Sequence, residues 1–191
     1  AKRLGDRVLK VSKKDGAWKP TTWAEAYAGL RRATMGLVAC GVRKGDRVGI
    51  VSRTRSEWSD ADFAILCSGG VTVGIYPSAS MAEMEHILSH SGCRLLFVEN
   101  DDLLERVEPI RRKIGLPERM VLFETGRDSL PEGAILLTDL TGLGRALDLG
   151  EPGRFDRTWR SVAAGDLGSG CIGRATDHRA GHRGRRGDAG F

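Results

Sequence analysis

Short apolar segments alternate with amphipathic ones from Arg47 onward, and this alternation limits the folds open to the chain more than any other feature. Four segments read as strands, namely residues 48–51, 71–75, 95–98 and 120–123. Strands that are apolar on both faces and joined through helices form a parallel sheet, which right-handed crossovers cover on both sides. We therefore expect an α/β fold, in which helices cover both faces of an open, mostly parallel sheet. Residues 135–137 read as a further strand, followed by a short helix from about Asp139.

The segment before this alternation predicts a β-hairpin and the start of a helix. The dipeptide Asp15-Gly16 suits the turn of a hairpin between residues 7–12 and residues 17–19. Thr22 is followed three residues later by Glu25, which is the spacing of a capping box. We expect a long helix to begin at Thr22.

This first helix is expected to end near Cys40, where Gly41 supplies the stop. Apolar residues at helical spacing define the face expected to be buried: Trp23, Tyr27, Leu30, Thr34, Leu37 and Val38. Gly29 and Gly36 each weaken a helix by about 1 kcal/mol relative to alanine. We interpret them as positions of close packing against the sheet.

Three further helices are expected to begin at polar capping residues, namely Ser56, Ser80 and Asn100. Their inward-facing residues share helical spacing: Trp58, Ala61, Ile65 and Leu66 in the first, Met81, Met84, Ile87 and Leu88 in the second, and Leu103, Val107 and Ile110 in the third. Gly69-Gly70 permits a tight turn from the first of these helices into the strand that follows.

The net charge of +5 is unevenly spread along the 191 residues. Residues 168–191 carry five arginines against Asp177 and Asp188, so most of the excess lies there. This stretch is rich in arginine and glycine, and it has one branched aliphatic residue and no helical or strand period, so we expect a disordered tail.

The rest of the chain has no apolar run near the roughly 20 residues of a membrane-spanning helix. Its charged start at Ala1 is unlike a signal peptide, and we expect the native N-terminus to lie upstream.

Several polar groups have a functional and a structural interpretation. His86 and His90 lie four residues apart, a spacing that can bind a metal ion, but we interpret them as part of a solvated helix face because no third ligand is evident. Asn100 and the acidic pair 101–102 stand at a helix start, where such residues cap the helix and complement its dipole.

Glycines and cysteines complete the set of candidates. The pattern Gly142-x-Gly144 is half of a dinucleotide-binding fingerprint, and we interpret it as a loop turn. The four cysteines are widely spaced and contain no C-x-x-C pair, so we expect free thiols and no zinc site: Cys40, Cys67, Cys93 and Cys171. Trp58 and Tyr76 could contact an acyl chain, although a core position is the simpler interpretation of Trp58.

Five blocks in order resemble the N-terminal part of the AMP-forming acyl-activating enzymes, and most of all the bacterial long-chain fatty acid–CoA ligases. They read T-T-W-A-E-A-Y-A-G-L from residue 21, G-V-R-K-G-D-R-V-G-I-V-S from residue 41, R-S-E-W from residue 55, A-I-L-C-S-G-G-V-T-V-G-I-Y-P from residue 64, and I-L-x-x-S-G-C-R-L-L-F-V from residue 87. The resemblance covers about residues 8–166 and departs from the family at Gly74, where proline is expected. It implies an incomplete N-terminal portion of the adenylate-forming fold, with residues 1–167 as a partial domain and residues 168–191 as the tail.

The family's phosphate-binding loop should follow this segment, but it is missing from the sequence. That loop reads about Y-T-S-G-T-T-G-x-P-K-G and wraps ATP phosphates with backbone amides and a lysine. Residues 168–174 stand at its place without those letters, and no lysine occurs after Lys113. Residues 171–175, read one nucleotide earlier, can encode V-Y-R-S-G. We therefore interpret the tail as an out-of-frame translation.

The resemblance implies the function of the complete enzyme. Such an enzyme joins a fatty acid with ATP to give an acyl-adenylate and then an acyl-CoA and AMP, using ATP, Mg²⁺ and CoA. We expect no catalytic, cofactor-binding or metal-binding residue within this chain, and hence a fragment that is inactive alone and binds none of these ligands tightly. The expected location is cytoplasmic, with peripheral contact to the inner face of the membrane. We also expect self-association through exposed apolar surface, and no specific nucleic-acid binding.

The alternative is a non-catalytic α/β interaction module whose basic tail contacts an acidic partner. Exposed apolar surface distinguishes the two hypotheses, since a partial enzyme should expose the surface that the remainder of the enzyme covers.

Overall fold

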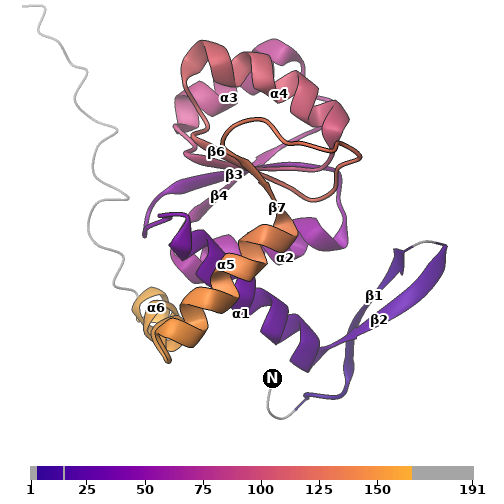
Figure 1. Ribbon diagram of the computed structural model, residues 1–191, viewed down its shortest axis with the longest axis vertical. Coiled ribbons are helices and arrows are strands. Elements are labelled where there is room, and N and C mark those ends of the chain that lie inside the picture. The colour runs from indigo at the N-terminus through magenta and orange to yellow at the C-terminus, as the bar shows by residue number, and fades with distance from the viewer. Residues whose placement is uncertain (1–3, 15, 165–191) are drawn as a thin grey trace, which may run out of the picture.

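A five-stranded parallel sheet forms the centre of the protein in the computed structural model, which describes residues 4–14 and 16–164. Its strands are β3 (Arg47–Val51), β4 (Val71–Ile75), β5 (Leu95–Val98), β6 (Arg119–Leu122) and β7 (Ala134–Leu136). They lie side by side in the order β4-β3-β5-β6-β7, with every neighbouring pair parallel (Figure 1). The expected α/β fold with an open parallel sheet is confirmed.

Helices cover both faces of this sheet. They are α1 (Trp23–Ala39), α2 (Ser56–Ser68), α3 (Met81–Ser91), α4 (Asp101–Ile114), α5 (Leu137–Gly150) and α6 (Arg154–Ala163). Helices α3 and α4 lie on one face, and α1, α2 and α5 lie on the other (Figure 1). Helix α6 is not among the elements expected from the sequence, and α5 is longer than the short helix expected there.

Strand β5 shows why both faces need a cover. Its four residues are all buried, and they alternate between two hydrophobic clusters. Leu96 and Val98 pack into the cluster under α3 and α4, whereas Leu95 and Phe97 pack into the cluster under α1, α2 and α5. Side chains of a strand alternate with a period of two, so a strand that is apolar throughout requires a hydrophobic layer on each side.

Most of the expected helix caps are present. The capping boxes of Thr22 with Glu25 and of Ser80 with Glu83 are formed, and the Asn100 side chain accepts a hydrogen bond from the Leu103 backbone. The prediction for α2 was wrong. Ser56 is its first helical residue, and the capping position belongs to Arg55, whose side chain makes no cap bond.

The expected buried helix faces are only partly right. Trp23 and Tyr27 are exposed, although their spacing puts them in line with the buried Leu37. Periodicity identifies which face of a helix is apolar, but it does not show how much of that face other elements cover. The first turns of α1 are left exposed because they run beyond the sheet toward the hairpin (Figure 1). Leu66 and Met81 are likewise exposed, since their helices flank β4 at the edge of the sheet.

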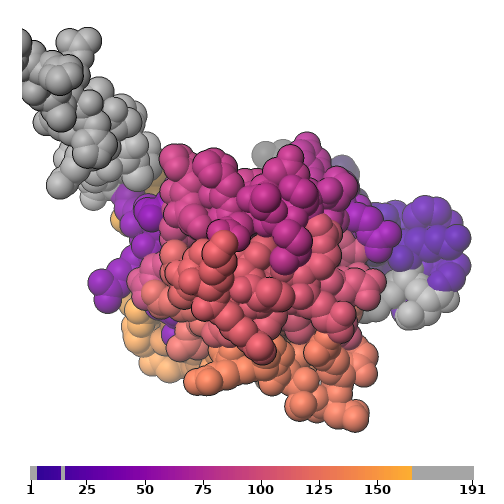
Figure 2. Space-filling view, turned by 90° about the horizontal axis from the view of Figure 1, so that it is seen from above, coloured from indigo at the N-terminus to yellow at the C-terminus, as the bar shows by residue number. Residues whose placement is uncertain are grey.

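The expected N-terminal hairpin is confirmed as a separate two-stranded sheet. Strand β1 (Val8–Lys14) pairs antiparallel with β2 (Ala17–Thr22), and Gly16 has a positive φ of 79° in the turn. Seen from above, the hairpin extends beyond the main body, whereas the side chains of α3 and α4 close over their face of the sheet (Figure 2). The hairpin therefore adds little to the central core.

Helices α1 and α5 touch backbone to backbone at two glycines. A Cβ atom added to Gly36 would lie 2.2 Å from the Leu140 carbonyl oxygen, and one added to Gly144 would lie 1.8 Å from the Arg32 carbonyl oxygen. Gly36 is therefore a position of close packing, as expected, but against a helix and not against the sheet. The interpretation of Gly142-x-Gly144 as a loop turn was wrong, because both residues lie within α5.

Within residues 4–14 and 16–164, no helix combines the length and the hydropathy that crossing a bilayer requires.

The α1–α5 contact predicts opposite effects for two glycines of the same helix. Gly142 has open space where a Cβ would be placed, so Gly142→Ala should raise the free energy of unfolding by up to about 1 kcal/mol through helix propensity. Gly144→Ala should lower it by about 3 kcal/mol, because the added methyl group forces the two helices apart. Urea denaturation of both variants measures the difference. Equal stability of the two variants would contradict the close contact.

Candidate functional site

The carboxyl edge of the sheet is where an open parallel α/β fold binds its ligands, at the point where successive crossovers leave in opposite directions. The connection from β3 leads to β4 on one side, and the chain then crosses back to β5 on the other side of β3. Val51 pairs with Val98 and Val98 pairs with Leu122, so the segments that follow β3, β5 and β6 emerge at one level. Charged residues occupy all three segments.

Glu99 is the central residue of this edge. It follows β5 directly, and only 2% of its surface is exposed. Its Oε1 accepts hydrogen bonds from Arg53 Nε at 3.0 Å and Nη2 at 2.8 Å, while its Oε2 accepts one from the Arg53 backbone nitrogen at 2.7 Å and one from Ser52 Oγ at 3.2 Å. Burial alone would raise the pKa of Glu99, but these hydrogen bonds outweigh it and hold the pKa below its ordinary value. The carboxylate is therefore ionised and fully satisfied.

Arg53 connects this buried carboxylate to the solvent. Its side chain is 76% exposed even though two of its nitrogens bind Glu99. The hydrogen bond to Glu99 raises the pKa of the guanidinium. An arginine held in this way has a fixed orientation at the switch point of the sheet, and its Nη1 is left to donate to a further group.

Arg55 contacts residues from all three of the segments that follow β3, β5 and β6. Its Nη1 and Nη2 donate to the two carboxylate oxygens of Glu124 at 3.0 and 3.2 Å, and its Nε donates to Glu57 at 2.8 Å. Its Nη1 also lies 3.8 Å from Glu99 Oε1, and its guanidinium carbon lies 5.9 Å from the centre of the Phe123 ring. The hydrogen bond to Glu124 is the main reason that the pKa of Arg55 is raised.

Asp101 holds the loop after β6. It accepts hydrogen bonds from Thr125 Oγ1 at 2.7 Å and from the Gly126 backbone at 2.8 Å, and Arg127 Nε lies 3.2 Å away. The backbone bond from Gly126 is the main cause of the lowered pKa of Asp101. Asn100 caps α4 as expected. Asn100, Asp101, Thr125 and Gly126 line a shallow cleft of about 360 Å³. Their hydrogen bonds order the loops around it.

The other candidates lie away from this edge. His86 and His90 are exposed on α3, with ring centroids 5.7 Å apart, and the described residues contain no group of three His, Cys, Asp or Glu that could hold a metal ion. Tyr76 is 81% exposed beside β4, and Trp58 is partly buried against the core. Cys40, Cys67 and Cys93 are free, and burial raises the pKa of each thiol, while Cys171 lies outside the described residues.

Sequence reasoning missed the whole Arg53–Glu99–Arg55–Glu124 network. The available signal was local, since Glu99 follows an apolar strand without a break and R-x-R precedes an expected helix. The sequence does not reveal which arginine meets which carboxylate, because the pairing depends on the order of the strands.

The Glu99 network predicts a pH-dependent stability. The pKa of Glu99 is lower in the folded protein than in the unfolded chain, so its contribution is present above the unfolded value and is lost as the pH falls through the lowered pKa. Glu99→Gln should lower the free energy of unfolding by about 2 kcal/mol at neutral pH, because hydrogen bonds to a charged group are lost. The difference from wild type should shrink at acidic pH.

Chemical denaturation at several pH values measures this. Glu118→Gln is the matched control, because Glu118 also binds an arginine, Arg94, but on an exposed surface where the effect is small. A Glu99→Gln effect that is independent of pH would refute the assignment.

Comparison with known proteins agrees with this fold and with the sequence blocks. The family model described as AMP-binding enzyme matches residues 1–135. The long-chain-fatty-acid–CoA ligase FadD15 of Mycobacterium bovis is 45% identical over 96 residues, which cover 50% of this chain and 16% of that protein. The human long-chain-fatty-acid–CoA ligase ACSBG2 is 28% identical over 105 residues, which cover 55% of this chain and 16% of its own length.

Solved structures share the fold at lower identity. The anthranilate CoA ligase AuaEII, solved with anthranoyl-AMP, has a TM-score of 0.61 at 23% identity, covering 73% of this chain and 25% of that one. A putative long-chain-fatty-acid CoA ligase from Rhodopseudomonas palustris has a TM-score of 0.59 at 21% identity, covering 71% and 32%. The chain spans about a sixth of the length of the curated relatives that it matches. It belongs to the family of AMP-binding enzymes.

Proposed function

We propose that this chain is part of a long-chain fatty acid–CoA ligase. The complete enzyme would join a fatty acid with ATP to form an acyl-adenylate and pyrophosphate, and CoA would then displace AMP to give the acyl-CoA. The observation that carries the proposal is the 45% identity to a ligase of this class over 96 residues, half of this chain. No observation favours the alternative of a stand-alone interaction module.

The described residues do not fit ATP and Mg²⁺ by themselves. Mg²⁺ needs free carboxylate oxygens, but Glu99 is satisfied by Arg53 and Ser52, and Glu124 is held by Arg55. Asp101 is bonded to the loop that it orders, which leaves Asp102 as the one carboxylate lining this cleft without a hydrogen bond or ion pair among the described residues. A single free carboxylate does not make a site for Mg²⁺ and a triphosphate. We therefore propose that this segment serves as a scaffold that positions Arg53, while the groups that handle nucleotide and metal lie in other parts of the enzyme.

We further propose that residues 168–191, which lie outside the described residues, are translated out of frame. The encoding DNA, sequenced from the codon of Arg154 to well beyond that of Phe191, tests this. A one-base shift should restore a phosphate-binding loop and an open frame. If no frame contains that loop, the interpretation of the tail is wrong.

The corrected frame also tests the function. Protein expressed from it should convert a long-chain fatty acid, ATP and CoA to acyl-CoA and AMP, whereas the 191-residue chain should form no acyl-CoA and exchange no pyrophosphate with ATP. The physical reason is that the sequence lacks the family's glycine-rich loop, whose backbone amides and lysine hold the phosphates of ATP. Radiolabelled pyrophosphate exchange measures the adenylation step separately. Turnover by the 191-residue chain would contradict the scaffold role.

The open edge of the sheet supports a proposal of self-association. Strand β4 pairs with β3 alone among the described strands, and four exposed apolar residues surround its free edge: Phe63, Leu66, Val71 and Tyr76. The hydrogen bond of 2.7 Å from Thr72 to Asp62 places this side of α2 beside β4. An unpaired strand edge with apolar neighbours is a template for pairing with another chain.

Sedimentation velocity at increasing concentration checks this proposal. The wild-type chain should form concentration-dependent oligomers, and Phe63→Glu with Val71→Lys should shift it toward monomer, because the two charges would be buried on pairing. Leu149→Lys is the control, since Leu149 is 72% exposed on α5, away from this edge. A wild-type chain that stays monomeric would contradict the proposal.

We also propose a cytoplasmic location with peripheral contact to the inner face of the membrane, because fatty acids partition into bilayers. Fractionation of expressing cells tests this, and exclusive recovery outside the cytoplasm would refute it.

A further inference from the structure

The amino edge of the sheet, opposite the switch point, contains a second cleft. It measures about 440 Å³ and lies between α6 and the turn that joins α1 to β3. Six of its lining residues are polar or charged: Arg43, Lys44, Ser68, Arg154, Thr158 and Ser161. None of the described residues that line it is an aspartate or a glutamate. The Ser68 hydroxyl already donates to the Ile65 carbonyl at 2.7 Å. A cleft with three cations, two further hydroxyl groups and no carboxylate among its lining residues has the composition of an anion site.

The wall formed by the α1–β3 turn is fixed by its own hydrogen bonds. The Arg43 backbone donates to Asp46 Oδ2 at 2.9 Å, the Gly45 backbone donates to the Gly69 carbonyl at 2.8 Å, and the Val42 backbone donates to the Leu37 carbonyl at 3.0 Å. These bonds hold the backbone of the turn, while the exposed side chains of Arg43 and Lys44 have no hydrogen-bond or ion-pair partner among the described residues.

The wall formed by α6 is anchored as well. Phe155 is buried, with its ring edge-on to Tyr27 at 5.9 Å and the Arg31 guanidinium 5.5 Å above it. Arg31 also makes two hydrogen bonds to Asp148, at 2.7 and 2.8 Å, which connects α1 to α5 just before α6 begins. Thr158 and Ser161 lie three and six residues after Phe155 on a helix whose position is therefore set, and they face the cleft.

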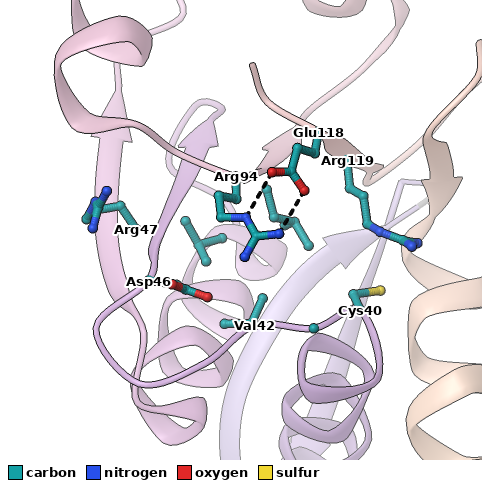
Figure 3. A pocket seen from close by; sticks show the side chains of 10 residues that line it. Cys40, Val42, Asp46, Arg47, Arg94, Glu118 and Arg119 are labelled. Atoms are coloured by element: carbon teal, nitrogen blue, oxygen red, sulfur yellow. Dashed lines mark hydrogen bonds and ion pairs between the residues drawn. The ribbon is translucent and has the colours of Figure 1, made fainter. Parts of the chain in front are cut away.

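Charged groups of both signs surround the cleft. An adjoining pocket shares Gly41 and Val42 with it, and there Arg94 and Glu118 point toward each other while Arg47 and Arg119 extend to either side (Figure 3). The carboxyl ends of α1 and α2 add about half a negative charge each. Asp46 accepts the Arg43 backbone hydrogen bond and Glu151 pairs with Arg154, so the side chains of Arg43 and Lys44 are the cations of the cleft that have no carboxylate bound to them.

We propose that this cleft binds a phosphate group, either of a free phosphate compound or of a lipid headgroup. Arg43 and Lys44 supply the charge, Arg154 closes the site from the side of α6, and the Thr158 hydroxyl donates a hydrogen bond. This proposal stands apart from the ligase function, since the cleft lies on the opposite edge of the sheet from Arg53.

Inorganic phosphate is the first probe, titrated at constant ionic strength while the melting temperature of the full chain is followed. The wild-type chain should show a saturable rise. Arg43→Ala with Lys44→Ala should weaken the apparent affinity at least about tenfold, the effect expected when charge-assisted hydrogen bonds are lost. Thr158→Val should weaken it without changing the charge, and this variant keeps the test decisive if the double variant proves unstable.

Two controls separate a built site from diffuse positive charge. Arg7→Ala with Lys13→Ala removes the same charge from the hairpin, and Arg183→Gln with Arg185→Gln and Arg186→Gln removes charge from the tail. Both should bind phosphate like wild type. An equal loss in the hairpin control, binding that depends on the tail alone, or the absence of saturable binding would each overturn the proposal.

Vesicles distinguish the two sources of phosphate. Vesicles of equal parts phosphatidylcholine and phosphatidic acid are pelleted with the protein, and vesicles of phosphatidylcholine alone serve as the blank. Loss of pelleting in the Arg43→Ala, Lys44→Ala variant identifies a lipid headgroup as a ligand. Unchanged pelleting together with lost phosphate binding identifies a free phosphate compound.

Discussion

The central sheet buries side chains on both of its faces, and the rest of the structure depends on this constraint. A strand such as β5, in which all four residues are buried, cannot exist in water without a helical layer above and below it. Helices α3 and α4 supply one layer, and α1, α2 and α5 supply the other. The sites at the two edges follow from the same arrangement, because parallel strands gather all the segments that follow them at one edge and all those that precede them at the other.

The sequence predicted the sheet well because its strands are local features. Runs such as L-L-F-V are apolar without interruption, and their order along the chain with helices between them restricts the pairing to parallel. The helix caps at Thr22 and Ser80 could also be predicted from the sequence, because each side chain binds a residue only three positions further along the chain. The contact between Gly36 and Gly144 could not be predicted, since it joins helices from opposite ends of the described chain. The cap of α2 was misplaced by one residue, because the capping position belongs to Arg55, whose side chain binds Glu57 and Glu124 and makes no cap bond that the sequence could indicate.

The candidate site illustrates the same limit. Arg53 and Glu99 come together because β5 lies next to β3, and Glu124 reaches Arg55 because β6 lies next to β5. Each charged residue was visible in the sequence, but the strand order that pairs them is a property of the whole sheet. Membership of the family could be predicted from the sequence, because it rests on short blocks of consecutive residues and does not depend on the strand order.

The contact between α1 and α5 has a consequence for synthesis. Arg32 and Gly144 are separated by most of the described chain, so α1 has no partner on that face until α5 has left the ribosome. At the usual pace of translation this interval is on the order of ten seconds. During that time the stripe around Gly36 and Leu37 remains uncovered while the strands of the sheet emerge. A nascent chain of this design therefore completes the cover of α1 only when the last part of its core has been made.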